Sequence, residues 1–136
     1  TCQGLSYVDK GNANLFCGSF VYSTACSAGK NLGPALIQAG CKAFIGFKEE
    51  SNAFENVDYR QMSMNCDQSG LFEFLSSGKT LKECFESMKN YYNTHIDHLD
   101  ELMDIDYRAE LVANREALVL IGDENIKLTD FILNNN

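Results

Sequence analysis

The stretch FVYSTACSAGKNLGPALIQAGCKAFIGFKEE, residues 20–50, decides the fold. Its apolar start at residues 20–22 predicts a short buried strand, and the small residues of 23–30 predict a turn. A helix is predicted at residues 34–39, where a glycine follows directly, and a second strand at residues 42–47. A strand, a crossover helix and a parallel strand form a βαβ unit, so an α/β fold is expected.

The turn after the first predicted strand carries Cys26. Parallel sheets build their sites beyond the carboxyl ends of the strands, so Cys26 is expected at such an edge, facing the start of the helix. The positive end of a helix dipole favours a thiolate and hence nucleophilic attack. Small neighbours, Ala25, Ser27 and Gly29, would let a substrate carbonyl approach and let backbone N–H groups, including that of Cys26, face a developing oxyanion. The alternative is a small buried cysteine that ends a strand.

The same residues resemble the caspase-like cysteine peptidases, the group that includes CHAT domains, separase and the gingipains. The resemblance lies in STACSAG at residues 23–29, GPAL at 33–36 and AGCKAFIG at 39–46. A weaker similarity covers LVLIGDENIKL at residues 118–128, which looks like the closing strand and Gly-Asp-Pro turn of these domains, with Glu124 in place of the proline.

The resemblance implies a three-layer α/β domain of caspase-like type, with a mostly parallel sheet, helices on both faces and Cys26 as the nucleophile. These peptidases pair the cysteine with an upstream histidine, and no histidine precedes Cys26 here. Residues 1–136 are therefore expected to form one partial domain, the carboxyl half, with the histidine supplied by an upstream segment or a second chain. The start at Thr1 without methionine suggests a processed product or a fragment.

The rest of the chain adds one strand and two helices to this expectation. Residues 117–122 predict a third strand, and a three-stranded parallel sheet is thin, so the domain is expected to be incomplete in this chain. Helices are predicted at residues 68–76 and 80–104. The longer helix starts with a capping box from Thr80 to Glu83 and carries an apolar stripe at helical spacing.

Substrate selection is suggested by the resemblance alone. In relatives such as separase, an acidic residue shortly after the strand that follows the nucleophile helps to hold a basic substrate side chain. Glu49 and Glu50 lie in that region and are the candidate substrate-binding residues. Lys48 precedes them, and the alternative is a solvated loop.

Composition narrows the choice of partner. A formal net charge of −8 with 11 Lys and Arg residues disfavours phosphate binding, so a protein or peptide substrate is expected and no nucleic acid. No apolar run resembles a signal peptide, and no membrane partner is expected. The acidic run at residues 97–110 predicts a solvated helix face, with a docking surface for a basic partner as the alternative.

The six cysteines show no CxxC pair and no clustering with histidine. Thiols in a cytoplasmic compartment are therefore expected rather than disulfides. Cys26 is expected to be the one thiol that reacts quickly with electrophiles, because the others look buried among apolar neighbours.

His95 and His98 lie three residues apart on the longer predicted helix, but no third ligand accompanies them, so no metal and no cofactor are expected. The family resemblance gives that helix a packing role, which argues against either histidine as the base for Cys26.

The predicted function is that of a hydrolase, a thiol protease that cleaves a protein substrate through a thioester at Cys26. The alternative is a catalytically inactive caspase-like module that binds and regulates a partner. A third interpretation is an unrelated small α/β binding protein.

Overall fold

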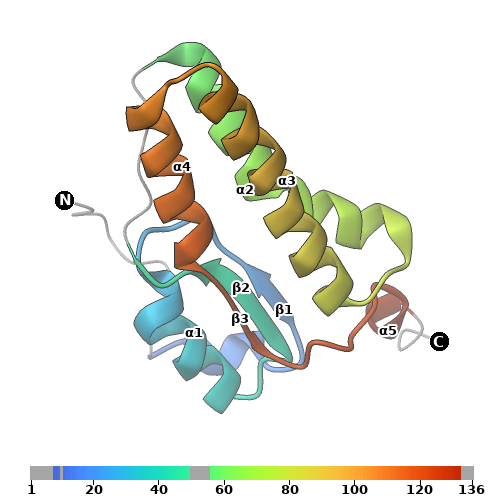
Figure 1. The fold of residues 1–136 in the computed structure, drawn as a ribbon. Helices are drawn as coiled ribbons and strands as arrows, with labels where there is room; N and C mark the ends of the chain where they lie inside the picture. Colours follow the sequence, from blue (N-terminus) through green and yellow to red (C-terminus); the bar gives the residue numbers. More distant parts are fainter. Residues whose placement is uncertain (1–7, 10, 50–55, 133–136) are drawn as a thin grey trace. The chain divides into compact units, whose positions relative to one another are not determined.

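The computed structural model describes residues 8–9, 11–49 and 56–132 of the 136 residues. The chain divides into two compact units. The sheet unit comprises Thr1–Ser51 with Ala117–Asp123, and the helical unit comprises Asn52–Glu116 with Glu124–Asn136. Each is described by itself, and Figure 1 shows the elements of both. The single partial domain expected over residues 1–136 stays a prediction.

The sheet unit confirms the three predicted strands and the βαβ unit. Strand β1, Phe20–Tyr22, lies parallel to β2, Ala43–Phe47, and helix α1, Ala28–Gln38, connects them. Strand β3, Leu118–Gly122, completes the order β1-β2-β3. The short 3-10 helix η1, Ala13–Phe16, precedes β1.

The expected parallel direction is wrong for the third strand, because β3 runs antiparallel to β2 and makes the sheet mixed. The chain leaves the sheet at the carboxyl end of β2 and returns to it at the same end. Phe47 is opposite Leu118, and Lys48 N–H donates to Ala117 O at 2.8 Å. An apolar strand pattern carries no information about direction, so only the return point of the chain decides it.

Glycines set how closely α1 packs on the sheet. A Cβ added to Gly29 would lie 2.5 Å from Val119 Cγ1, and one added to Gly33 would lie 2.8 Å from the Phe44 ring. These glycines share one face of the helix with the buried Leu36. Close approach of this face explains why both positions lack a side chain.

Helix α1 begins at Ala28, so the predicted start at Pro34 is wrong. Proline lacks an N–H and favours the first turn, but here it lies inside the helix and leaves one internal hydrogen bond unmade. The helix ends before Gly40 as predicted. Gly40, at φ +100°, donates its N–H to Ile37 O at 3.1 Å, and Cys41 N–H donates to Leu36 O at 2.9 Å, which is a Schellman motif.

In its described residues, the helical unit contains four helices: α2 (Val57–Ser77), α3 (Leu81–Glu101), α4 (Ile105–Ala117) and the short α5 (Thr129–Ile132). The last residue of α4, Ala117, is counted with the sheet unit. Helix α3 confirms the predicted long helix, and its buried face is the predicted stripe, which includes Met88, Tyr92 and Leu99. Helix α2 starts well before the predicted residue 68, and α4 was not predicted as a separate helix.

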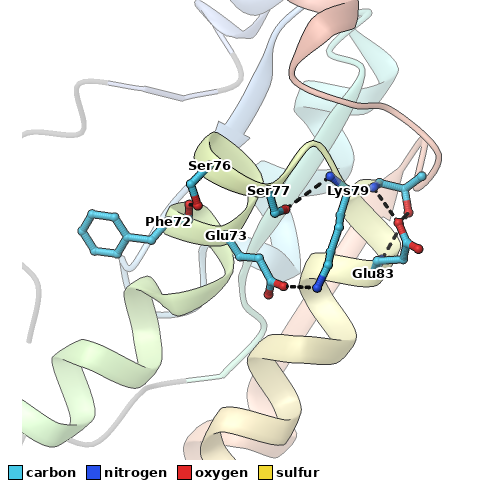
Figure 2. Close-up of polar contacts among 7 residues, drawn as sticks. Phe72, Glu73, Ser76, Ser77, Lys79 and Glu83 are labelled. Atoms are coloured by element: carbon cyan, nitrogen blue, oxygen red, sulfur yellow. Dashed lines mark hydrogen bonds and ion pairs between the residues drawn. The ribbon is translucent and has the colours of Figure 1, made fainter.

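Figure 2 shows the polar contacts that join α2 to α3 at the predicted break. Helix α2 ends at Gly78, whose φ of 69° is left-handed. Lys79 Nζ then pairs with Glu73 Oε1 at 2.6 Å, across the turn. The capping box is formed, because Thr80 N–H donates to Glu83 Oε2 at 2.8 Å and Glu83 N–H donates to Thr80 Oγ1 at 3.3 Å.

Among the described helices, none combines the length and the apolar character needed to cross a membrane.

Candidate active site

Cys26 lies in the turn between β1 and α1 and is half-buried. Beyond the end of β1 the chain stays paired with β2, because Ser23 N–H donates to Ile45 O at 3.0 Å. Helix α1 begins at Ala28, two residues after Cys26. The cysteine is therefore at the carboxyl end of β1 and next to the N-terminus of a helix.

The residue after Cys26 has an uncommon backbone conformation. Ser27, at φ 58° and ψ 8°, is left-handed although it is not glycine, and its side chain makes no capping hydrogen bond. Such a conformation costs on the order of 1–3 kcal/mol and persists where surrounding structure enforces it. Nothing in the sequence signals it, since serine is a usual residue before a helix.

A backbone hydrogen bond across the sheet edge holds this turn in place. Ser27 N–H donates to Glu49 O at 3.1 Å, and Glu49 lies two residues beyond the end of β2. The structure thus brings the Cys26 turn and Glu49 together, and the Glu49 side chain is exposed. Glu50, the other candidate substrate-binding residue, lies outside the described residues.

The three small residues around Cys26 have defined structural contacts. Ala25 N–H donates to Ser23 Oγ at 3.2 Å, and Ser27 N–H is bonded to Glu49 as described above. At Gly29, a Cβ would also lie 3.0 Å from the Phe47 carbonyl carbon and oxygen. Ala25 and Ser27 therefore shape the turn through their N–H groups, and Gly29 seats the first turn of α1. Their predicted oxyanion role stays a prediction.

Cys17, Cys26, Cys41, Cys66 and Cys84 are thiols, as expected for the described cysteines. Cys41, Cys66 and Cys84 are buried, and burial raises the pKa of each thiol, that of Cys66 to about 12. The expectation that every other thiol is buried is wrong for Cys17, which is exposed. Cys17 follows η1 and precedes Gly18, at φ +78°, so the chain turns at the surface there.

Both histidines belong to α3 in the helical unit. The His95 ring lies edge-on to Tyr91, with 4.9 Å between the ring centroids. Burial, and secondarily the nearby His98, lowers the pKa of His95 below its ordinary value. In the part of the chain that the structure describes, no three His, Cys, Asp or Glu side chains are grouped so as to hold a metal ion.

Comparison with protein-family models, with curated proteins and with solved structures found no match to this chain.

Proposed function

We propose that this chain is the carboxyl-terminal half of a caspase-like cysteine endopeptidase with a three-layer fold, in which Cys26 is the nucleophile. The observation that carries the proposal is the position of Cys26 between β1 and α1, beside a left-handed Ser27 that is bonded to Glu49. Backbone strain next to an accessible thiol, near a helix N-terminus, is typical of a turn that has a function.

In the proposed reaction the Cys26 sulfur attacks the carbonyl carbon of a peptide bond, and the thiol proton passes to a histidine. The oxyanion forms at the turn, where the Cys26 N–H and the first turn of α1 supply positive dipoles. The histidine then protonates the leaving amine as the carbon–nitrogen bond breaks. Water attacks the thioester, which releases the carboxylic acid and regenerates the thiol.

The histidine is proposed to come from an upstream segment or a second chain. In the described sheet, β1 is an edge strand, so a further strand beside it would extend the sheet next to Cys26. A parallel strand there would end at the same edge as β1, which is the edge where Cys26 lies. The cytoplasm is the proposed compartment, because the cysteines of the sequence show no CxxC pair and no clustering with histidine.

Glu49 is the proposed selector of a basic residue before the scissile bond. Its backbone is bonded to the residue that follows Cys26, so its exposed carboxylate starts from the same edge as the sulfur. A carboxylate that must lose water to contact substrate favours a cationic side chain and penalises an apolar one. Glu50 remains a second candidate.

The test is covalent labelling of the protein expressed with its complete coding sequence, so that any upstream segment is present. The probe is a peptidyl acyloxymethyl ketone with arginine next to the reactive group, and mass spectrometry identifies the labelled cysteine. Probe labelling and hydrolysis of a matching fluorogenic peptide are expected to be lost in Cys26→Ala.

The matched control is Cys17→Ala, because Cys17 is also an accessible thiol of the sheet unit. This variant is expected to keep both labelling and hydrolysis. Labelling that is equal at Cys17 and Cys26, together with no peptide hydrolysis, would contradict the peptidase proposal and favour the inactive regulatory module.

A further inference from the structure

Four large apolar side chains are exposed at one end of the helical unit. Val57 is 72% exposed, Leu102 57%, Met103 81% and Ile105 71%. Val57 starts α2, and the other three form the turn from α3 into α4. Large apolar side chains that gather on a surface mark sites of interaction more often than single exposed ones do.

Contacts between α2 and the α3–α4 turn bring these side chains to the same place. Tyr59 Oη donates to Asp104 Oδ2 at 2.6 Å, and the rings of Tyr59 and Tyr107 lie with 4.1 Å between their centroids. Figure 1 shows α2 beginning at the end of the unit where α3 passes into α4. We call the exposed side chains of Val57, Leu102, Met103 and Ile105 the apolar tip.

Met103 occupies a position that normally belongs to glycine. It is left-handed, at φ 57°, and donates its N–H to Asp100 O at 3.0 Å, while Asp104 N–H donates to Leu99 O at 3.0 Å. This is the same Schellman motif that Gly40 completes after α1. A methionine here is strained and also almost fully exposed, so neither local conformation nor burial explains it.

The charge around the apolar tip is strongly acidic. Within residues 97–110 there is one basic residue besides His98, which is Arg108, and its Nε is already paired with Asp100 Oδ1 at 3.2 Å. The first turn of α2 adds one carboxylate, Asp58, and one cation, Arg60, so the excess of negative charge comes from the run at residues 97–110. The acidic residues of the run are Asp97, Asp100, Glu101, Asp104, Asp106 and Glu110.

We infer that the apolar tip docks a basic amphipathic segment of a partner protein, whose apolar side chains cover Leu102, Met103 and Ile105 while Lys or Arg residues face the surrounding carboxylates. Complementary charge selects this occupant. Nucleic acids and anionic lipids would be repelled, and a second copy of the chain would place acidic residues opposite acidic residues. Methionine suits such a surface because its flexible thioether adapts to a partner. This inference is independent of Cys26.

The test uses the full chain and a synthetic amphipathic helix of leucine and lysine, with fluorescence anisotropy as the readout. Met103→Gly is expected to weaken binding about tenfold or more, as loss of an interface anchor does. Its melting temperature is expected to be no lower than that of the parent, because glycine fits the left-handed position. The double variant Leu102→Ser, Ile105→Ser is expected to lose binding to a similar or greater extent.

Two matched controls separate docking from general attraction to a cationic peptide. Leu15→Ser removes a leucine that is 76% exposed, and so more exposed than Leu102, from the sheet unit and is expected to leave binding unchanged. The contribution of charge is tested with Glu101→Gln, which is expected to weaken binding a few-fold at low salt. Glu86→Gln, at another exposed position of α3, is expected not to do so.

Equal affinity of the parent and the Met103→Gly and double variants, or no binding by the parent at low salt, would overturn the inference. So would a leucine–lysine peptide of scrambled order that binds as well as the amphipathic one. Self-association that the double variant abolishes would instead assign the tip to a second copy, and binding to neutral phosphatidylcholine vesicles would assign it to a membrane.

Discussion

The two units of this chain differ in the residues that make their packing close: glycines in the sheet unit and large side chains in the helical unit. In the sheet unit, helix α1 approaches the sheet closely through two glycines: Gly29 lies against Val119 and the Phe47 backbone, and Gly33 lies against the side chains of Phe44 and Ile121. In the helical unit, large side chains such as Met88 and Tyr92 fill the space between helices, and Gly70 of α2 faces the flexible end of Met88, whose Sδ would lie 3.0 Å from an added Cβ. The sheet unit therefore has little room for change beside the Cys26 turn, whereas the helical unit can adapt.

The largest expected effect is a loss of peptidase activity, and it tests whether the sheet unit carries the reaction. If the sheet unit carries the reaction, Cys26→Ala should lower kcat/KM of the complete enzyme by about a thousandfold or more. The free energy of unfolding should change little, since one sulfur at a half-buried position leaves only a small void. His95→Gln in the helical unit should retain activity. If His95→Gln lost as much activity as Cys26→Ala, the reaction would not belong to the sheet unit alone.

Glycine substitutions test the packing difference directly. In Gly29→Ala the new methyl group meets Val119 and the rigid Phe47 backbone, so we expect a loss of about 2–3 kcal/mol in unfolding free energy. Gly70→Ala meets mainly the movable Met88 and gains helix propensity, so its stability should change by less than about 1 kcal/mol. Urea unfolding measures both. Equal losses would show that the two units tolerate added atoms alike.

The helical unit should show a pH dependence that originates at one carboxyl. Burial raises the pKa of Asp67 from 3.8 to about 6, although the hydrogen bond from Tyr92 Oη opposes this shift. The folded state then holds a proton that the unfolded chain has lost, so the unfolding free energy should fall as pH rises through this interval. The expected fall is about 2–3 kcal/mol relative to Asp67→Asn.

Urea unfolding of the two proteins at a series of pH values checks this dependence. Asp97→Asn, at an exposed position of α3, is the control and should titrate in parallel with the parent. A difference between the parent and Asp67→Asn that stays constant from pH 4 to pH 7 would contradict the assignment to Asp67.

The smallest effect concerns the two left-handed residues that are not glycine, one in each unit. Ser27→Gly and Met103→Gly should each raise the unfolding free energy by up to about 1 kcal/mol, because glycine accepts positive φ. Thermal melts measure the gain. Ser27→Gly should nevertheless reduce peptidase activity if the turn must hold the sulfur rigidly. A gain in stability without any loss of activity would mean that the strain at Ser27 has no role in the reaction.

Local patterns predicted much of this fold. Three predicted features depend on residues that are neighbours in sequence: the strands, the capping box at Thr80 and the end of α1 before Gly40. The early start of α2 was missed because the Asn56 side chain, which accepts hydrogen bonds from Asp58 and Tyr59 N–H groups, was not identified as a helix cap. The direction of β3 depends on distant pairing that no local pattern encodes.

In the candidate site, too, the features set by local sequence were predicted and those set by distant contacts were not. The positions of Cys26 at a strand–helix junction and of Glu49 beyond the next strand follow from the βαβ pattern, and the structure joins Glu49 to Ser27, the residue after Cys26, by a backbone hydrogen bond. The left-handed Ser27 could not be predicted, because it is tied to a distant residue: its N–H donates to Glu49 O, beyond the end of β2. The exposure of Cys17 was also missed, since apolar neighbours in sequence do not ensure burial in space.

The pairing of Phe47 with Leu118 has a consequence for how the chain folds. All of α2, α3 and α4 lie between these two partners in sequence, so β3 reaches β2 only after a long loop has closed. The contacts between α2 and α3 span a short turn and carry a much smaller entropic cost of closure. The helical hairpin is therefore expected to form first, while β2 still lacks β3. Addition of β3, at the edge of the sheet opposite β1, is expected to be the slow step.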